Sequence, residues 1–208
     1  MAYIGNKPAN KAVVARDLDP AVITGQTALA VAPADTDEFL ISDAGVLKRL
    51  DASLIGGGKV LQRVYVESGA LITGSSNSIP EDDTIPQNTE GTEVMTLAIT
   101  PTSATSKLHI FANAFGSHSA STRTGIALFV DSTANALAFT GSANGGATTM
   151  HGTQLQHVLT SGSTSARTYK IRMGGMASSG TLSFNGQSGA RKFGGVILSS
   201  IIIMEIEA

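Results

Sequence analysis

The sequence predicts an all-β protein, in which an extended N-terminal arm precedes a C-terminal jelly-roll β-sandwich. Three observations favour this class. Short runs rich in β-branched residues alternate with clusters of Gly, Ser, Asn and Thr, as strands and turns do in sandwiches and barrels. The 208 residues include 23 glycines and no tryptophan, and no long stretch has helical periodicity. With 42% hydrophobic residues and a net charge of −2, the chain should collapse and not stay disordered.

The last predicted strand, residues 198–206, constrains the architecture most. A strand with one face on the core and one in water alternates apolar and polar side chains. Here Ile201 and Ile203 lie on one face, while Ile202, Met204 and Ile206 lie on the other. The run is far shorter than the roughly 20 residues that a membrane-spanning helix needs. We therefore expect a central strand whose second face is covered by another element or another subunit.

Eight further runs precede this strand in the predicted head domain, residues 59–208. One of them, at 106–115, places Leu108 and Ile110 on one face and His109 and Phe111 on the other. A long connection at 67–93 carries six acidic residues and no Lys or Arg. Its spacing fits no calcium loop, so we expect a solvated surface. The eight predicted strands span residues 59–66, 92–99, 106–115, 125–131, 134–139, 154–159, 167–173 and 181–184.

Residues 1–58 are expected to form the arm. The first 35 have little periodicity, which indicates an extended segment that packs on something else, with a disordered tail as the alternative. A short strand is expected at 28–31.

A hairpin is predicted near residues 37–50, because Asp43-Ala44-Gly45 separates two apolar runs and Gly tolerates the positive φ of a turn. An isolated hairpin is marginal in water, so it should dock on a neighbour. The glycines at 56–58 mark the boundary with the head.

No catalytic signature is present, so we expect no enzyme and no cofactor. The chain lacks Gly-x-Ser-x-Gly, His-Glu-x-x-His, a phosphate loop and a dinucleotide fingerprint. The absence of Cys excludes disulfides and thiolate metal sites. His151 and His157 are six residues apart and would share a strand face, so a His ring on a symmetry axis is the alternative to ordinary surface or interface histidines.

The composition also limits the kinds of partner that the protein is expected to bind. Only 14% of residues are charged, which gives no reason to expect binding to nucleic acid or insertion into a membrane. The N-terminus lacks a basic region followed by an apolar run, so no signal peptide is expected. Glycine-rich loops at 141–146 and 185–191 carry Asn, Gln and Arg, which hydrogen-bond sugar hydroxyls. They offer no aromatic platform, and plain turns are the alternative.

Several segments resemble proteins of tailed bacteriophages. Residues 34–51, ADTDEFLISDAGVLKRLD, are similar to a hairpin module of phage structural proteins. Residues 79–93, with 97–101 and 106–110, resemble the opening of jelly-roll domains in tail-fibre-like virion proteins of marine and freshwater phages. The opening MAYIGNKP also resembles the N-terminus of that family, and together the matches touch about half of the chain.

The resemblance implies a non-enzymatic virion protein, assembled in the host cytoplasm as a homotrimer. Its arm would bind other virion proteins, from the tail or the major capsid protein, and its head would contact the host surface, including host carbohydrate. The alternative is a capsid decoration (cement) protein, whose trimer clamps capsid subunits. A carbohydrate-cleaving spike is disfavoured because no paired carboxylates can be assigned to one site.

The implied site residues fall into three groups. The predicted trimer interface comprises Ile201, Ile202, Ile203, Met204 and Ile206. Virion attachment is assigned to Phe39, Ile41, Val46, Leu47 and Leu50. The loops at 116–124, 140–150 and 185–192 should face outward, with exposed residues Arg123, Asn144, Asn185, Gln187 and Arg191.

Overall fold

The structure is a computed structural model, and it describes residues 27, 33–34, 36–44, 46–55, 58–120, 123–142, 146–177 and 179–208. The chain divides into two compact units, Met1–Gly56 and Gly57–Ala208. The strand predicted at 28–31 and most of the predicted arm lie outside the described residues.

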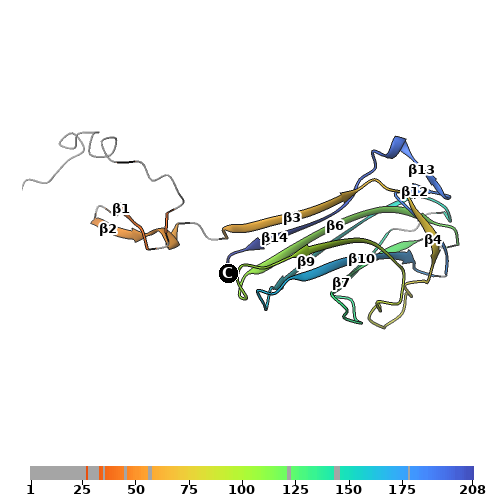
Figure 1. Ribbon diagram of the computed structural model, residues 1–208, viewed down its shortest axis with the longest axis horizontal. Coiled ribbons are helices and arrows are strands. Elements are labelled where there is room, and N and C mark those ends of the chain that lie inside the picture. Colours follow the sequence, from red (N-terminus) through yellow and green to blue (C-terminus); the bar gives the residue numbers. More distant parts are fainter. Residues whose placement is uncertain are drawn as a thin grey trace, which may run out of the picture. The chain divides into compact units, whose positions relative to one another are not determined.

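The first unit contains the predicted hairpin. Strands β1 (Glu38–Asp43) and β2 (Val46–Asp51) pair antiparallel, with Phe39 opposite Leu50 and Asp43 opposite Val46 (Figure 1). Ala44 has φ of 51° at the turn, where the left-handed region is needed. A short 3-10 helix, η2 (Ala52–Leu54), follows.

The second unit is a sandwich of two antiparallel sheets, which confirms the predicted all-β class (Figure 1). One sheet has the order β5-β10-β7-β8. In the other, β14 lies between β3 and β6, β9 pairs with β6, and β11 joins the end of β6 to β4. The long strands are β3 (Val60–Ser68), β5 (Thr92–Ile99), β6 (Lys107–His118), β7 (Thr124–Val130), β9 (His151–Thr160), β10 (Arg167–Gly175) and β14 (Ser199–Ile206). The shorter ones are β4 (Ile72–Ser76), β8 (Ala138–Gly141), β11 (Gly180–Phe184), β12 (Gly186–Gln187) and β13 (Ala190–Arg191), with a 3-10 turn η3 (Phe193–Gly195).

The core fills the space between the two sheets. From the β14 sheet, Leu108, Ile110, Ile201 and Ile203 are fully buried. Facing side chains come from the opposite sheet, and they include Ile126, Leu128, Tyr169, Ile171 and Met173. Burying an aliphatic side chain of this size contributes about 1.5–3 kcal/mol, so this layer is the main source of stability. The central position predicted for the last strand is confirmed.

A buried carboxylate closes one end of the sandwich. Glu205 follows Ile203 on the inward face of β14 and is 0% exposed. Its carboxylate accepts hydrogen bonds from the backbone amides of Thr102 and Ser103, at 2.9–3.1 Å. Further donors are the hydroxyls of Thr102 and Ser106, at 3.0 and 2.6 Å, and the Gln62 amide, at 2.6 Å. Glu205 thus fixes the turn between β5 and β6 against β14.

The long connection before β5 differs from its prediction. It contains β4, and its apolar residue Ile79, 1% exposed, packs on Ala127 and Phe129. The segment therefore covers the second face of β7, all of whose residues are buried. Its acidic side chains do lie largely at the surface, as expected.

Two other differences are small. The predicted strand at 134–139 is displaced, since β8 begins at Ala138. The very short strands β12 and β13 were not predicted, because they pair over only two residues each.

Candidate subunit interface

The outward face of the sheet formed by β3, β14, β6 and β9 carries several large apolar side chains. The strand pairing creates cross-strand rows on this face. One row consists of Tyr65, Ile202, Phe111 and Gln156, and the next consists of Arg63, Met204, His109 and Val158. Val60 and Ile206 follow in a third row with Lys107 and Thr160. We call the apolar members the outer apolar face: Val60, Tyr65, Phe111, Val158, Ile202, Met204 and Ile206.

This face is accessible in the isolated chain. Val60, Tyr65 and Val158 are 51%, 57% and 54% exposed, and the other four side chains are half-buried. The face has apolar members on all four neighbouring strands, which Figure 1 shows side by side, and His109 separates Met204 from Val158 in the second row. Scattered apolar side chains are normal on a surface, but a contiguous apolar patch marks an interaction site.

Polar groups frame the patch. At the β3 edge, the Arg63 guanidinium carbon lies 4.9 Å from the centre of the Tyr65 ring. Beyond the Ile202 row comes a polar row in which Asn113 Oδ1 accepts hydrogen bonds from the Ser200 amide (2.6 Å) and hydroxyl (2.8 Å). An apolar centre with a polar rim is the usual anatomy of a protein–protein interface.

The patch is also not flat. A shallow hollow of about 240 Å³ lies along its boundary with the polar row, lined by residues that include Phe111, Gln154 and Ile202. Tyr65, in contrast, is more than half exposed on the neighbouring strand β3. The face therefore offers both a recess and an exposed ring to an approaching surface.

The structure divides the predicted trimer-interface residues between two faces. Ile202, Met204 and Ile206 lie on the outer apolar face. Ile201 and Ile203 do not: both are 0% exposed in the core, so their assignment to a subunit contact is wrong. They pack against the opposite sheet of their own chain and have no surface left for a partner.

The predicted virion-attachment residues lie in the hairpin. The register places Phe39, Ile41, Val46 and Leu50 on one face, and Phe39 and Val46 are 41% and 58% exposed. Leu47 is opposite Ser42, and its side chain is outside the described part of the chain. The role of these five residues stays a prediction.

The predicted exposed loop residues meet different outcomes. Arg191 is exposed and Gln187 half-buried, while the Arg123 guanidinium forms a two-pronged ion pair with Glu81. Asn144 lies outside the described residues. The prediction for Asn185 is wrong, since it is 1% exposed and its amide donates to the carbonyls of Ser68 and Ala70, at 2.8 and 3.1 Å.

The two spaced histidines lie on β9, both at odd-numbered positions and so on one strand face. That face is directed at the core, where Thr153 and Leu155 lie between them. Among the described residues, no group of three or more His, Cys, Asp or Glu side chains could hold a metal ion. In the same part of the chain, no helix is long and apolar enough to span a membrane.

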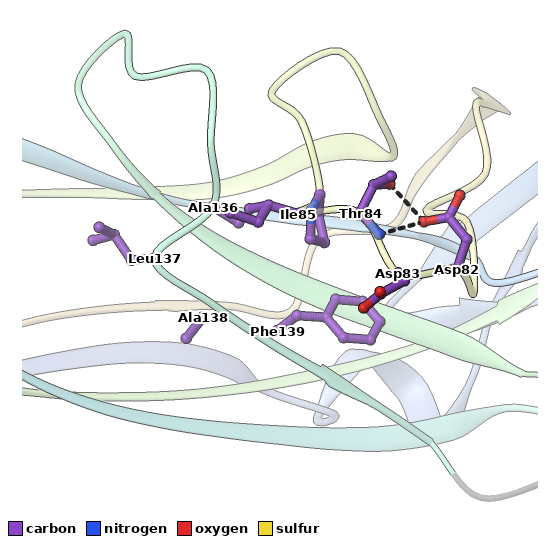
Figure 2. A pocket seen from close by; sticks show the side chains of 9 residues that line it. Asp82, Asp83, Thr84, Ile85, Ala136, Leu137, Ala138 and Phe139 are labelled. Carbon is purple, nitrogen blue, oxygen red and sulfur yellow. Dashed lines mark hydrogen bonds between the residues drawn. The ribbon is translucent and has the colours of Figure 1, made fainter.

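A second hollow, of about 420 Å³, lies between residues 82–86 and the edge of the other sheet at 136–139. Figure 2 shows the carboxylate-bearing Asp82 and Asp83 at one end and the Phe139 ring beside them. The Thr84 hydroxyl and amide donate to Asp82 Oδ1, at 2.5 and 2.9 Å, and these bonds lower the pKa of Asp82. A general acid needs a raised pKa, so Asp82 is unsuited to that role.

Comparison with known proteins gives only distant likenesses. No protein-family model matches the chain, and no curated protein matches it. Among solved structures, Eiger TNF from S. frugiperda aligns with a TM-score of 0.39 and 10% identity, over 70% of this chain and 93% of that one. A structure of infectious bursal disease virus, Gt strain, aligns with a TM-score of 0.35 and 13% identity, over 80% of this chain and 41% of the viral chain.

The D431N mutant VP2 of the same virus, in derived T=1 particles, gives a TM-score of 0.36 and 15% identity, over 86% and 44% of the two chains. The chain thus spans about two fifths of the viral chains that it matches. Because these TM-scores lie below 0.5, the fold class rests on the strand order of the chain itself.

Sequence reasoning missed Tyr65, Phe111 and Val158 as interface candidates. Each lies in a strand that alternates inward and outward side chains, and each is a large apolar residue on the outward side. That alternation was the available signal, but it becomes informative only when the three strands are known to be neighbours.

Proposed function

We propose that this protein is a non-enzymatic structural protein of a tailed-phage virion, which assembles as a homotrimer through the outer apolar face. The head would be a surface fibre or knob that contacts the host, and the N-terminal segment would attach it to the particle. The observation that carries the proposal is the outer apolar face on β3, β14, β6 and β9, on the side of the sheet away from the core.

A second copy of the chain is the occupant of this face that burial of apolar surface favours. Removing apolar surface from water contributes about 25 cal/mol per Å², and the face includes three large side chains that are more than half exposed. A closed cyclic assembly buries the same patch on every subunit, so none remains exposed. Only 14% of the residues are charged, and an uncovered apolar patch on such a chain promotes association.

Attachment through the hairpin has its own support. Two antiparallel strands alone are marginally stable in water. Phe39, Leu40 and Val46 are 41–76% exposed, so most of the hairpin's apolar surface is uncovered in the described unit. Docking this surface on another virion protein would stabilise both the hairpin and the attachment.

A cement protein is the second candidate, and the spacing of the elements favours it. Only residues 55–59 separate the 3-10 helix η2 from the first strand of the head. A fibre normally holds its head away from the particle with a shaft, and five residues provide none. A trimer whose heads follow the attachment segment after so few residues is suited to clamping capsid subunits.

Imaging of intact particles with symmetry applied tests the proposal. Density for this protein at the tail, in multiples of three copies, is expected for a fibre or knob. Density at icosahedral threefold or quasi-threefold positions would establish the cement alternative. Absence of the protein from purified particles, judged by mass spectrometry, would refute a virion role altogether.

A further inference from the structure

Three loops that are far apart in the sequence meet at the end of the sandwich opposite the start of β3. They are the end of β6, the segment before β9 and the β12–β13 hairpin, and together with β11 they surround a hollow of about 300 Å³. In Figure 1 the labels β12 and β13 mark this end of the second unit. Six hydroxyl side chains and Gly189 line the hollow, which we call the hydroxyl hollow: Ser117, Ser119, Thr148, Thr181, Ser183 and Ser188.

Backbone amides position three of the six hydroxyls. Ser117 Oγ accepts from the Ser188 amide at 3.3 Å, and Ser183 Oγ accepts from the Gly189 amide at 2.9 Å. Ser119 Oγ accepts from the Thr181 amide at 2.9 Å. None of these three hydroxyls has an acceptor for its own proton among the described residues. Each hydroxyl therefore keeps its own proton for a hydrogen bond to water or to a bound molecule.

The hollow combines a buried floor with an accessible rim. Ser117 and Ser183 are 1% and 2% exposed at the floor, while Ser119, Thr148 and Thr181 are exposed at the rim.

The backbone around the hollow is unusual as well. Thr148 has φ of 66°, which a β-branched residue rarely adopts, and its amide donates to the His118 carbonyl at 2.9 Å. Strained residues of this kind cluster at ligand sites, where the surrounding structure holds them in place. The site is therefore shaped before any ligand arrives.

The lining chemistry selects the class of ligand. The described lining residues include no charged side chain, so an oxyanion would find no compensating cation, and no aromatic ring is present for a flat ligand to stack on. Hydroxyls donate and accept, which matches a neutral molecule rich in hydroxyl groups. The volume is at the low end of the roughly 300–1,000 Å³ typical of small-molecule sites.

We infer that the hydroxyl hollow binds one neutral sugar unit of a host-surface glycan. The inference deepens the proposed function and rests on it for the source of the sugar, since it gives the exposed head a ligand class and a place to bind it. The site is formed by residues other than the predicted Asn185, Gln187 and Arg191. Four of its hydroxyl residues lie in the three loops predicted to face outward, and the other two lie on β11.

Saturation-transfer NMR on the full-length chain tests the inference. The probes are free glucose, galactose, mannose, rhamnose and N-acetylglucosamine at millimolar concentrations, with inorganic sulfate tested separately by its effect on the protein amide resonances. At least one sugar should receive saturation from the wild-type protein. Thr181→Val removes a rim hydroxyl at nearly constant volume, and it should raise the Kd of that sugar at least fivefold. Thr181→Trp should abolish binding by filling the hollow.

Thr96→Val is the matched control, because Thr96 is an exposed threonine on β5 in the other sheet, and binding should be unchanged. The inference is overturned if no sugar of the panel binds, if Thr181→Val binds as the wild type does, or if sulfate alone binds. The molar mass of the same samples separates this result from the trimer. A trimer that binds no sugar refutes the site alone, whereas a monomer that binds sugar refutes the assembly alone.

Discussion

Glu205→Gln gives the sharpest test of how the sandwich is closed. The carboxylate is fully buried and accepts from five donor groups, on Gln62, Thr102, Ser103 and Ser106. A glutamine keeps the volume but replaces one carboxylate oxygen with an NH₂ group, which must then face a hydrogen-bond donor. The hydrogen bonds to the other oxygen remain, but their acceptor is no longer charged. Hydrogen bonds to a charged group contribute about 1.5–3 kcal/mol and neutral ones about 0.5–1.5 kcal/mol. Because the amide keeps one acceptor oxygen, we expect a loss of roughly 2–4 kcal/mol in unfolding free energy at pH 7.

The pH dependence of this loss follows from the pKa of Glu205. Burial alone would raise the pKa, but the hydrogen bonds from Ser106, Gln62, Thr102 and Ser103 outweigh it and lower the value from 4.5 to about 2. A carboxyl whose folded pKa lies below its unfolded pKa stabilises the fold above the unfolded value, and this contribution is lost as the pH falls toward the folded value. The difference between wild type and Glu205→Gln should therefore be full above pH 4.5 and shrink between pH 4.5 and 2.

Urea unfolding at pH 7, 4 and 3, at one protein concentration, measures this difference. Burial also lowers the pKa of His118, but that effect is common to both proteins and cancels in the comparison. A Glu205→Gln protein within 0.5 kcal/mol of wild type at pH 7, or a gap that stays constant down to pH 3, would refute the reasoning.

Substitutions at three further positions test a core residue, a buried turn residue and a buried hydroxyl without a partner. Ile203→Ala should lower the unfolding free energy by about 2–5 kcal/mol and leave the oligomer mass unchanged, because the residue lies in the core. A change of mass with no loss of stability would show that Ile203 belongs to the subunit interface. Asn185→Ala should cost roughly 2–4 kcal/mol in chemical unfolding, because it removes three side-chain hydrogen bonds, two to carbonyls and one from the Ser199 hydroxyl, and places Ala at φ of 55°. Asn185→Gly should recover part of that loss, and equal costs for both would contradict the φ argument. Tyr169→Phe should leave stability unchanged or slightly raised, because the buried Tyr169 hydroxyl has no partner among the described residues; a loss above about 1 kcal/mol would show that the hydroxyl is satisfied.

Local patterns were enough to predict most strands. In β6, the inward and outward sets separate as the alternation of residues 106–115 predicts, with Leu108 and Ile110 buried and Phe111 outward. The hairpin at 38–51 was predictable because turn chemistry and flanking apolar runs are both local. The class of fold follows from these elements.

Long-range contacts account for what could not be predicted. Both faces of β14 carry apolar residues, and its one charged residue, Glu205, faces the core instead of water. The hydrogen-bond donors that make this possible come from residues 62 and 102–106, which are far away in the sequence. Asn185 resembles an ordinary turn residue, yet its partners Ser68 and Ala70 are more than a hundred residues away. The outer apolar face and the hydroxyl hollow each assemble from strands and loops whose neighbours the sequence alone does not reveal.

The outer apolar face as a trimer contact is the central claim, and the molar mass of the purified chain in solution tests it most directly. Light scattering coupled to gel filtration should give about 64 kDa, three times the 21.2 kDa of one chain. Ile202→Asp should reduce this to the monomer mass with the β-sheet circular dichroism intact, because it places a charge in the contact while Ile202 is outside the core. Val196→Asp, at a 79% exposed apolar residue outside the face, should remain trimeric. A wild-type mass of 21 kDa at micromolar concentration, or a trimer that survives Ile202→Asp, would contradict the account.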